Sequence, residues 1–379
     1  MEFSFSEDQD ELRRAARRFL EVASSEERVR AAMETEQGYD SAVWEQLAGE
    51  LAWTALTIPE EYGGLGMSTM DLHPLMEEMG RVLLCSPFFS TICLAANALL
   101  LGGGPEQKEH WLPSFAAGEM TATLAYTEKN GRWDSTGVEA TYSRSGAGYV
   151  LRGHKHYVLD GHTANLVIVA ARSERSKGDE GVSLFAVPGN VEGMKRSWLP
   201  TLDQTRRQAA IELNDVVVPA DSLLGEEGQG WPVCERTVDL AIIALAAEQV
   251  GTAEACLDMS VEYAKVRQQF GRAIGSFQAI KHKCADMLMI VESARSSAFY
   301  ASALAAQGDP DLSETASSAK AFCSDAVFHC AAENIQIHGG IGFTWEHPAH
   351  MYFKRAKSSE MLFGAPPLHR ERVAQLMGL

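Results

Sequence analysis

The sequence lacks the features that mark secreted, metal-binding or membrane-spanning proteins. Its seven cysteines include no C-x-x-C pair, so we interpret them as reduced core residues rather than a disulfide framework or a metal site. The first residues, MEFSFSEDQDELRR, contain neither the basic segment nor the apolar core of a signal peptide. The apolar run Leu240 to Ala247 is far shorter than the roughly 20 residues that cross a bilayer. We therefore expect a cytoplasmic protein with no membrane partner.

Positive charge is also scarce. The chain has 33 Lys and Arg against 51 Asp and Glu, which gives a net charge of −18. A polyanion has to be met by clustered Lys and Arg, and no dense block of these residues stands out. We therefore expect no nucleic-acid partner. With 379 residues, 46% of them apolar, the chain is long enough for two to three domains of about 150 residues each.

Three zones of different composition follow one another along the chain. Residues 1–118 show helical periodicity, residues 119–228 consist of short β-type runs punctuated by Gly, Asp, Ser and Pro, and residues 229–379 are helical again. We therefore predict an α+β protein with an N-terminal helical domain at 1–118, a central β domain at 119–228 and a C-terminal helical domain at 229–379.

Local signals place individual elements within these zones. Ser6 followed by Gln9 is a capping-box pattern at the start of an amphipathic helix. The segment PEEYGGLG, Pro59 to Gly66, contains three glycines and a proline and is predicted to be a loop. Further helices are expected at about 40–55, 70–84, 88–101, 233–267, 277–307, 312–336 and 348–357.

Two glycine turns that follow helices carry the most specific pattern. The first is R-x-x-F-G at Arg267–Gly271, with F-Q-x-I-x-x-K-x-A-D-M starting at Phe277, and the second is Q-I-H-G-G-I-G at Gln336–Gly342. Taken with PEEYGGLG, Thr127–Glu128 and Asn214–Pro219, these segments resemble the acyl-CoA dehydrogenase family in order and spacing, over essentially the whole chain. The resemblance implies an N-terminal α-helical domain, a central β-barrel-like domain and a C-terminal four-helix bundle, assembled as a dimer of dimers around FAD and an acyl-CoA thioester.

The chemistry of the two turns agrees with a dinucleotide ligand. An arginine at a helix end can bind a diphosphate with two charge-assisted hydrogen bonds, and glycines let backbone N–H groups approach closely. In the family, these segments reach the FAD of the neighbouring subunit. The resemblance therefore implies that Arg267, Phe270, Gln336, Gly339 and Gly340 bind cofactor. The alternative is a surface ion pair for the arginine and helix C-caps for the glycines.

Two flavin-contacting segments of the family are altered here. The family's T-E-P-x-x-G-S-D retains Thr127 but has Arg132 and Trp133 in place of its Gly and Ser. The family's K-x-W-I-T-N-G retains an aromatic residue, Tyr157, but has Leu159 in place of the Thr, and leucine has no side-chain donor for the flavin ring. Thr127 and Tyr157 remain candidate cofactor-binding residues.

The carboxylate that removes the α-proton in this family is missing. The family usually has this Glu in a Y-E-G-T turn, and Phe363 stands at that position here. Some members have the Glu on the first helix of the C-terminal domain, where this chain has Ala241 and Ile242. Glu248 lies roughly 10 Å further along that helix and is too distant to replace it, because a base must come within about 3 Å of its proton. We therefore assign no catalytic residue to this chain.

These observations lead to one expectation for function and two alternatives. We expect the companion subunit of a heterotetrameric (α2β2) acyl-CoA dehydrogenase, with a homologous partner that supplies the Glu, and with a bulky or steroid-like acyl-CoA as substrate. One alternative is a homotetramer in which Glu360 or Glu128 is the base. The other is a non-catalytic acyl-CoA-binding or assembly protein on the same scaffold.

Three other groups of residues were considered as possible ligand-binding or packing residues. His154 and His156 share one strand face but have no third ligand nearby in sequence, so we predict no metal site. Arg206 and Arg207 are expected to make a contact within a turn, with a contact to the CoA phosphates as the alternative. The small residues between Ala241 and Gly251 indicate tight helix packing.

Overall fold

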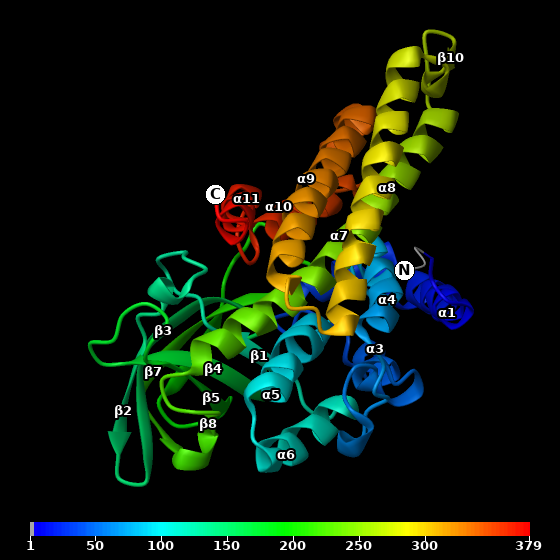
Figure 1. Ribbon diagram of the computed structural model, residues 1–379. Helices are drawn as coiled ribbons and strands as arrows, with labels where there is room; N and C mark the ends of the chain where they lie inside the picture. Colours follow the sequence, from blue (N-terminus) through cyan, green and yellow to red (C-terminus); the bar gives the residue numbers. More distant parts are fainter. Residues whose placement is uncertain (1–3) are drawn as a thin grey trace. The chain divides into compact units, whose positions relative to one another are not determined.

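The computed structural model describes residues 4–379, so the first three residues of the acidic N-terminal segment lie outside it. The order of helices, sheet and helices is as predicted, and Figure 1 shows it in the colours of the sequence. The chain forms two compact units. The helical unit contains the described residues up to Ala31 together with Thr69–Leu84 and Ile242–Leu379, and the sheet unit contains Ala32–Ser68 and Cys85–Ala241. The predicted three-domain borders stay a prediction.

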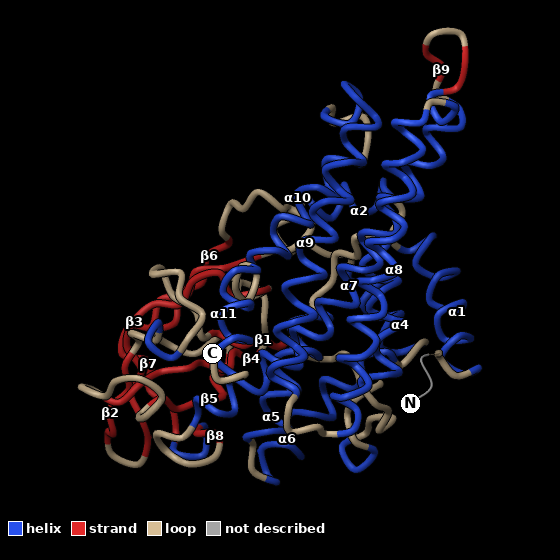
Figure 2. Tube along the Cα trace, turned by 45° about the horizontal axis from the view of Figure 1, so that its top comes forward, coloured by secondary structure: helices blue, strands red, loops and turns tan. Residues whose placement is uncertain are grey.

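The helical unit is built from long helices that lie side by side, as the tube of Figure 2 shows. In this unit, α8 packs against α9, and α9 also packs against α10 and α11. Its elements are α1 (Glu7–Ala23), α2 (Glu26–Glu34, which runs into the sheet unit), α4 (Thr69–Arg81), α7 (Gly230–Val266, which begins in the sheet unit), β9 (Gln268–Gln269), β10 (Arg272–Ala273), a 3-10 turn (Ile274–Ser276), α8 (Gln278–Gln307), α9 (Leu312–His338), a 3-10 turn (Gly339–Phe343), α10 (Ala349–Met361) and α11 (Pro366–Leu376). The helices α2 and α11 were not predicted.

The predicted capping box at the start of α1 is confirmed. The Ser6 hydroxyl accepts from the backbone N–H of Gln9, and the Gln9 side chain accepts from the backbone N–H of Ser6. These reciprocal bonds satisfy two N–H groups that a helix leaves unpaired at its start.

A buried carboxylate joins α1 to α4. Glu77 on α4 accepts from Arg13 at 2.7 Å and lies 2.9 Å from the ring nitrogen of His73, with only 1% of its surface exposed. Burial raises the pKa of Glu77, but the hydrogen bond and charge of His73, with the charges of Arg13 and Arg295, outweigh it and hold the pKa below its usual value. The ionised form therefore stabilises the fold.

We expect Glu77→Gln to destabilise the helical unit by about 3 kcal/mol, because it leaves the partly buried Arg13 without its counter-ion. Since the folded pKa is depressed, Glu77 contributes its full stability above the unfolded value, and the contribution disappears as the pH falls through the folded pKa. Denaturant unfolding, followed by circular dichroism at pH values from about 3 to 7, where carboxylates titrate, measures both the loss of stability and its pH dependence. Glu11→Gln, on the exposed face of α1, is the control, and an equal loss in both variants would contradict the prediction.

The helices α4 and α7 cross at two glycines. A Cβ built on Gly80 would lie 2.0 Å from the carbonyl oxygen of Glu248, and one built on Gly251 would lie 1.8 Å from that of Glu77. Thr252 adds a hydrogen bond to the Gly80 carbonyl across the crossing. Gly251 therefore serves close helix packing, as the small residues predicted.

The length and hydropathy of α7 would allow it to cross a membrane, although no single apolar run in it is long enough. In the fold, 89% of its most apolar stretch is buried. Its apolar character is therefore explained by the core that it forms.

The sheet unit contains one mixed sheet of eight strands, drawn in red in Figure 2. The strand order is β6-β7-β3-β2-β4-β5-β8, and β1 pairs in parallel with β4. Its core is lined by inward-facing apolar residues that include Val169, Phe185 and Ile211. The strands are β1 (Ala122–Ala125), β2 (Thr141–Ser145), β3 (Gly148–Leu159), β4 (Leu166–Ser173), β5 (Val182–Pro188), β6 (Met194–Trp198), β7 (Gln208–Pro219) and β8 (Leu223–Leu224).

Short irregular helices accompany the sheet. The single helix predicted at 40–55 is wrong, because the backbone turns left-handed at Ala52 (φ +52°) and divides the segment. The predicted PEEYGGLG loop contains one 3-10 turn, and α6 was not predicted. These elements are α3 (Ser41–Glu45), a π-helical turn (Gln46–Glu50), 3-10 turns at Trp53–Ala55, Glu60–Tyr62, Ser135–Gly137 and Ala220–Ser222, a π-helical segment (Phe89–Ala96), α5 (Asn97–Gly102) and α6 (Pro105–Ala116).

Candidate functional site

The R-x-x-F-G segment forms a hairpin at the end of α7. Arg267 follows the last helical residue, and β9 and β10 then pair through Arg272 and Gln269 (Figure 1). The Arg267 guanidinium is exposed and has no partner among residues 4–379, so it is not the surface ion pair of the alternative reading. Phe270 is 92% exposed and held at φ +54°, a conformation that an exposed phenylalanine adopts at a cost. Both side chains are thus presented outward.

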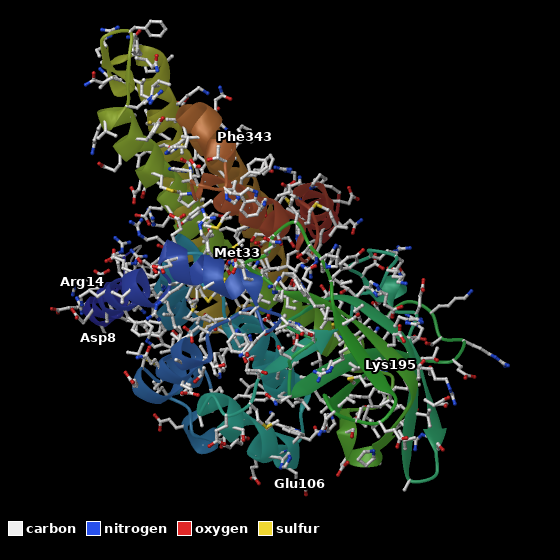
Figure 3. The ribbon with its side chains drawn as sticks, turned by 180° about the vertical axis from the view of Figure 1, so that it is seen from behind. Asp8, Arg14, Met33, Glu106, Lys195 and Phe343 are labelled. Carbon is white, nitrogen blue, oxygen red and sulfur yellow. The ribbon has the colours of Figure 1, made fainter. Side chains whose placement is uncertain are left out.

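The Q-I-H-G-G-I-G segment ends α9 in the same unit. Gln336 is exposed on the last turn and has no partner among the described residues. Gly339 caps the helix with φ +64°, which agrees with the C-cap reading. However, a Cβ built on Gly339 or Gly340 would meet nothing within 4 Å, so packing within the chain does not require glycine at Gly340. Of the next residues, Gly342 is buried, whereas Ile341 and Phe343 (labelled in Figure 3) are exposed, Phe343 at 77%.

A local excess of positive charge surrounds the hairpin. Residues 265–283 contain five Lys and Arg and no Asp or Glu, in a chain whose net charge is −18. This feature was missed in the sequence because the cations are spaced out rather than consecutive. An unpartnered arginine, open glycine backbone and positive potential together fit the diphosphate of FAD.

The other two candidate cofactor residues lie in the sheet unit. The Thr127 hydroxyl is buried and donates to the carbonyl oxygen of His156 at 2.6 Å, so its proton is used within the chain. Tyr157 occupies a β-bulge between β3 and β7 at φ +61°, and its ring is 39% exposed. A strained, exposed aromatic residue is typical of a binding position, so Tyr157 fits a ring-stacking role better than Thr127 fits a side-chain contact.

The first alternative base, Glu128, is neutralised by a buried lysine. One carboxylate oxygen of Glu128 accepts from Lys155 Nζ at 2.6 Å and from the backbone N–H groups of Glu139 and Ala140 at 2.8 and 2.9 Å. Glu128 is 3% exposed and Lys155 is completely buried. Burial lowers the pKa of Lys155, and the charge of Glu128 opposes that change. Glu128 is therefore held within the sheet unit by three hydrogen bonds.

The acids of the helical unit are also paired. The Glu248 carboxylate, 4% exposed, accepts from Arg355 at 2.8 Å. Glu360 accepts from Lys357 at 2.9 and 3.1 Å. Sequence reasoning did not assign Arg355, because its partner Glu248 lies 107 residues away.

The turn at Phe363 is held from two sides. The buried Lys320 donates to the carbonyl oxygens of Ser359 and Glu360 at 3.0 Å, which caps the end of α10. His369 Nε2 lies 3.0 Å from the carbonyl oxygen of Phe363 and donates to it. Burial, with the charge of Lys320, lowers the pKa of His369 to about 4, so the ring is neutral near pH 7.

Phe363 itself is 3% exposed with φ +61°. The position where the family has its base is therefore well ordered and filled by an apolar ring. Neither Lys320 nor His369 was found from the sequence, because both act through backbone carbonyls.

Arg206 and Arg207 lie in the interior. Arg207, 2% exposed, donates to the carbonyl oxygens of Met33 and Thr35 and stacks on the Trp198 ring at 3.9 Å. Arg206 lies over the ring of Phe89. Both side chains thus make contacts within the chain, and the alternative of a CoA-phosphate contact finds no support in them. Residues 4–379 bring together no group of three His, Cys, Asp or Glu side chains that could hold a metal ion.

The chain matches three family models along its length. They are the acyl-CoA dehydrogenase N-terminal domain at residues 6–119, the middle domain at 123–216 and the C-terminal domain at 228–378. A curated relative, acyl-CoA dehydrogenase IpdE2 of Mycolicibacterium smegmatis, is 35% identical over 98% of both chains.

Two solved structures share the fold. One is the ChsE4-ChsE5 complex from Mycobacterium tuberculosis (TM-score 0.90, 26% identity, 100% of this chain and 99% of that one). The other is the Tcur3481-Tcur3483 steroid ACAD (TM-score 0.88, 29% identity, 98% of both chains).

Proposed function

Since the chain belongs to the acyl-CoA dehydrogenase family, whose members are FAD-dependent oxidoreductases acting on CH–CH bonds, we propose that it is the companion subunit of a heteromeric member. In this proposal, a homologous partner supplies the catalytic carboxylate, and this chain supplies the cationic hairpin and glycine turn that bind the partner's FAD. The enzyme would convert an acyl-CoA to its 2,3-unsaturated form.

The pairing of every candidate acid supports this division of labour most strongly. A base has to be free to accept a proton within hydrogen-bonding distance of the substrate. Glu128 is held by Lys155 and two backbone N–H groups, and Glu248 is held by Arg355. Phe363 fills the position of the family base with a ring that cannot accept a proton. By contrast with these paired acids, Arg267 and Gln336 are exposed and unpartnered within the described chain.

The residues of this chain would act on the cofactor rather than on the acyl group. FAD, when bound, supplies the acceptor for the β-hydride. Arg267 would bind the diphosphate with a bidentate, charge-assisted pair, and the backbone N–H groups at Gly339 and Gly340 would complete the anion site. Phe270 would cover the site with an apolar ring and exclude water.

A bulky, steroid-like acyl group is the substrate class that we propose. Two-chain assemblies appear among the structural neighbours, and one of them is described as a steroid ACAD. Small residues along α7, namely Ala241, Ala244, Ala246 and Ala247, are compatible with a large acyl group. A cytoplasmic location fits this role.

The proposal is tested by producing the chain alone and together with the product of the adjacent gene, if that product is a homologous chain with the family Glu. The chain alone should reduce a dye with acyl-CoA at least about 100-fold more slowly than the mixture, because a positioned base contributes about 10²- to 10⁴-fold. Glu360→Gln should leave the rate of the mixture unchanged. Rapid flavin bleaching by the isolated chain, abolished by Glu360→Gln, would instead establish a self-sufficient homotetramer. Bound acyl-CoA without flavin reduction in the mixture would favour a non-catalytic role.

A further inference from the structure

The two cofactor-binding segments are joined by a stack of aromatic rings. Tyr263 on α7 and His338 on α9 have ring centroids 4.3 Å apart and planes inclined by 29°. Tyr263 lies one helical turn before Arg267, and the Arg267 backbone N–H donates to the Tyr263 carbonyl oxygen at 2.9 Å. His338 is the residue directly before Gly339. One ring contact therefore connects the helix end that carries the arginine to the helix end that carries the glycine turn.

The His338 ring has a fixed orientation. Its Nδ1 lies 2.8 Å from the carbonyl oxygen of Asn334, and a carbonyl only accepts, so Nδ1 carries the proton. Asn334 is itself held by the Ser260 hydroxyl of α7 at 3.0 Å. A Cβ on Gly342 would lie 3.1 Å from the His338 Cβ, so the glycine turn folds back closely onto this residue.

A second histidine ring, that of His347, packs against His338 with the ring planes inclined by 43°. The His347 ring lies 4.3 Å from that of His338, and its Nδ1 accepts from the backbone N–H of Ala349 at 3.2 Å. Burial lowers the pKa of His338, and burial with the charge of His338 lowers the pKa of His347, so both rings are neutral near pH 7. Glu26 and Arg30 of α2 face His347 with opposite charges, and His350 and Lys354 lie on α10 beside them.

We propose that the stack of Tyr263, His338 and His347 is a positioning device that fixes the arginine and the glycine turn at the spacing the FAD diphosphate requires. The inference rests on the proposed function and deepens it, because it names the residues that give the cofactor site its geometry. Protonation of both imidazoles places like charges 4.3 Å apart and opens the stack. Cofactor retention should therefore fall as the pH drops below about 6.5, the pKa of an ordinary histidine.

The experiment measures FAD dissociation from the assembled two-chain complex by flavin fluorescence. The pH is varied from about 5 to 8, because histidine titrates in this range. At a pH of about 7.5, where the rings are neutral, His338→Ala should weaken FAD binding about five- to tenfold. This is the factor expected for the loss of one ring stack. His338→Phe keeps a ring, so it should bind FAD nearly as tightly as the wild type, and the loss of FAD on acidification should be reduced in it. His329→Ala, an exposed histidine on the same helix, is the matched control.

Tyr263→Leu tests the same contact from α7 in case His338→Ala does not fold, and it should show a similar loss. Normal FAD retention in Tyr263→Leu, or an unchanged acid profile in His338→Phe, would overturn the inference. If Arg267→Ala weakens FAD binding while the stack variants do not, only the positioning role fails. If Arg267→Ala has no effect, the proposed function fails as well.

Discussion

Arg267→Ala is expected to lower the affinity of the two-chain complex for FAD about 10- to 100-fold, because hydrogen bonds to a charged group are worth about 1.5–3 kcal/mol. The Arg267 side chain is exposed and makes no hydrogen bond or ion pair within residues 4–379, so its removal should leave the fold of this chain intact. Equilibrium titration of apo-complex with FAD measures the effect. The affinity for FAD should depend less on salt concentration in Arg267→Ala than in the wild type, because one phosphate contact has been removed.

Lys265→Ala is the matched control for charge. Lys265 lies two residues before Arg267 and is also exposed, but its amine is paired with Glu262 at 2.5 Å. If general positive potential attracts the cofactor, the two variants should lose affinity equally. If Arg267 binds the diphosphate directly, only Arg267→Ala should show the large loss. Unchanged FAD affinity in Arg267→Ala would exclude the assignment of this segment to the cofactor.

Lys155→Met is expected to have the largest effect on stability, a loss of about 3–5 kcal/mol, because it leaves the Glu128 carboxylate buried without a counter-ion. The two backbone N–H donors at Glu139 and Ala140 remain and keep the loss at the lower end of that range. Thermal and denaturant unfolding of the chain, followed by near-UV and far-UV circular dichroism, measures the change. The sheet unit should respond, because both partners lie within it.

The double variant Lys155→Met with Glu128→Gln separates structure from catalysis. It removes both charges, so its stability should recover by at least about 1 kcal/mol relative to Lys155→Met alone, as expected for coupled neighbours. The folded double variant should retain the dehydrogenase rate of the two-chain complex. A rate about 10³-fold lower with normal FAD content would instead identify Glu128 as the base, since that is the contribution of a positioned base.

The departures of this chain from its family were visible in the sequence, but their consequences were not. Phe363 and Ala241 occupy the two base positions by simple counting along motifs. Whether Glu128 could replace the missing base depended on its partner Lys155, which lies 27 residues away. No spacing rule connects residues that far apart. Arg207 shows the same dependence on distant partners, since its side chain is buried against carbonyl groups and a tryptophan ring that the sequence did not identify.

The sequence by itself determined the helix, sheet and helix order, the family, and the two segments Arg267–Gly271 and Gln336–Gly342, because helical periodicity, strand alternation and glycine turns are local properties of the chain. Only the tertiary structure decided which charged groups are neutralised and which remain available. The physical reason is that burial makes an unpaired charge costly, so packing brings distant acids and bases together, and the exposed Arg267 is left without a partner within the described chain.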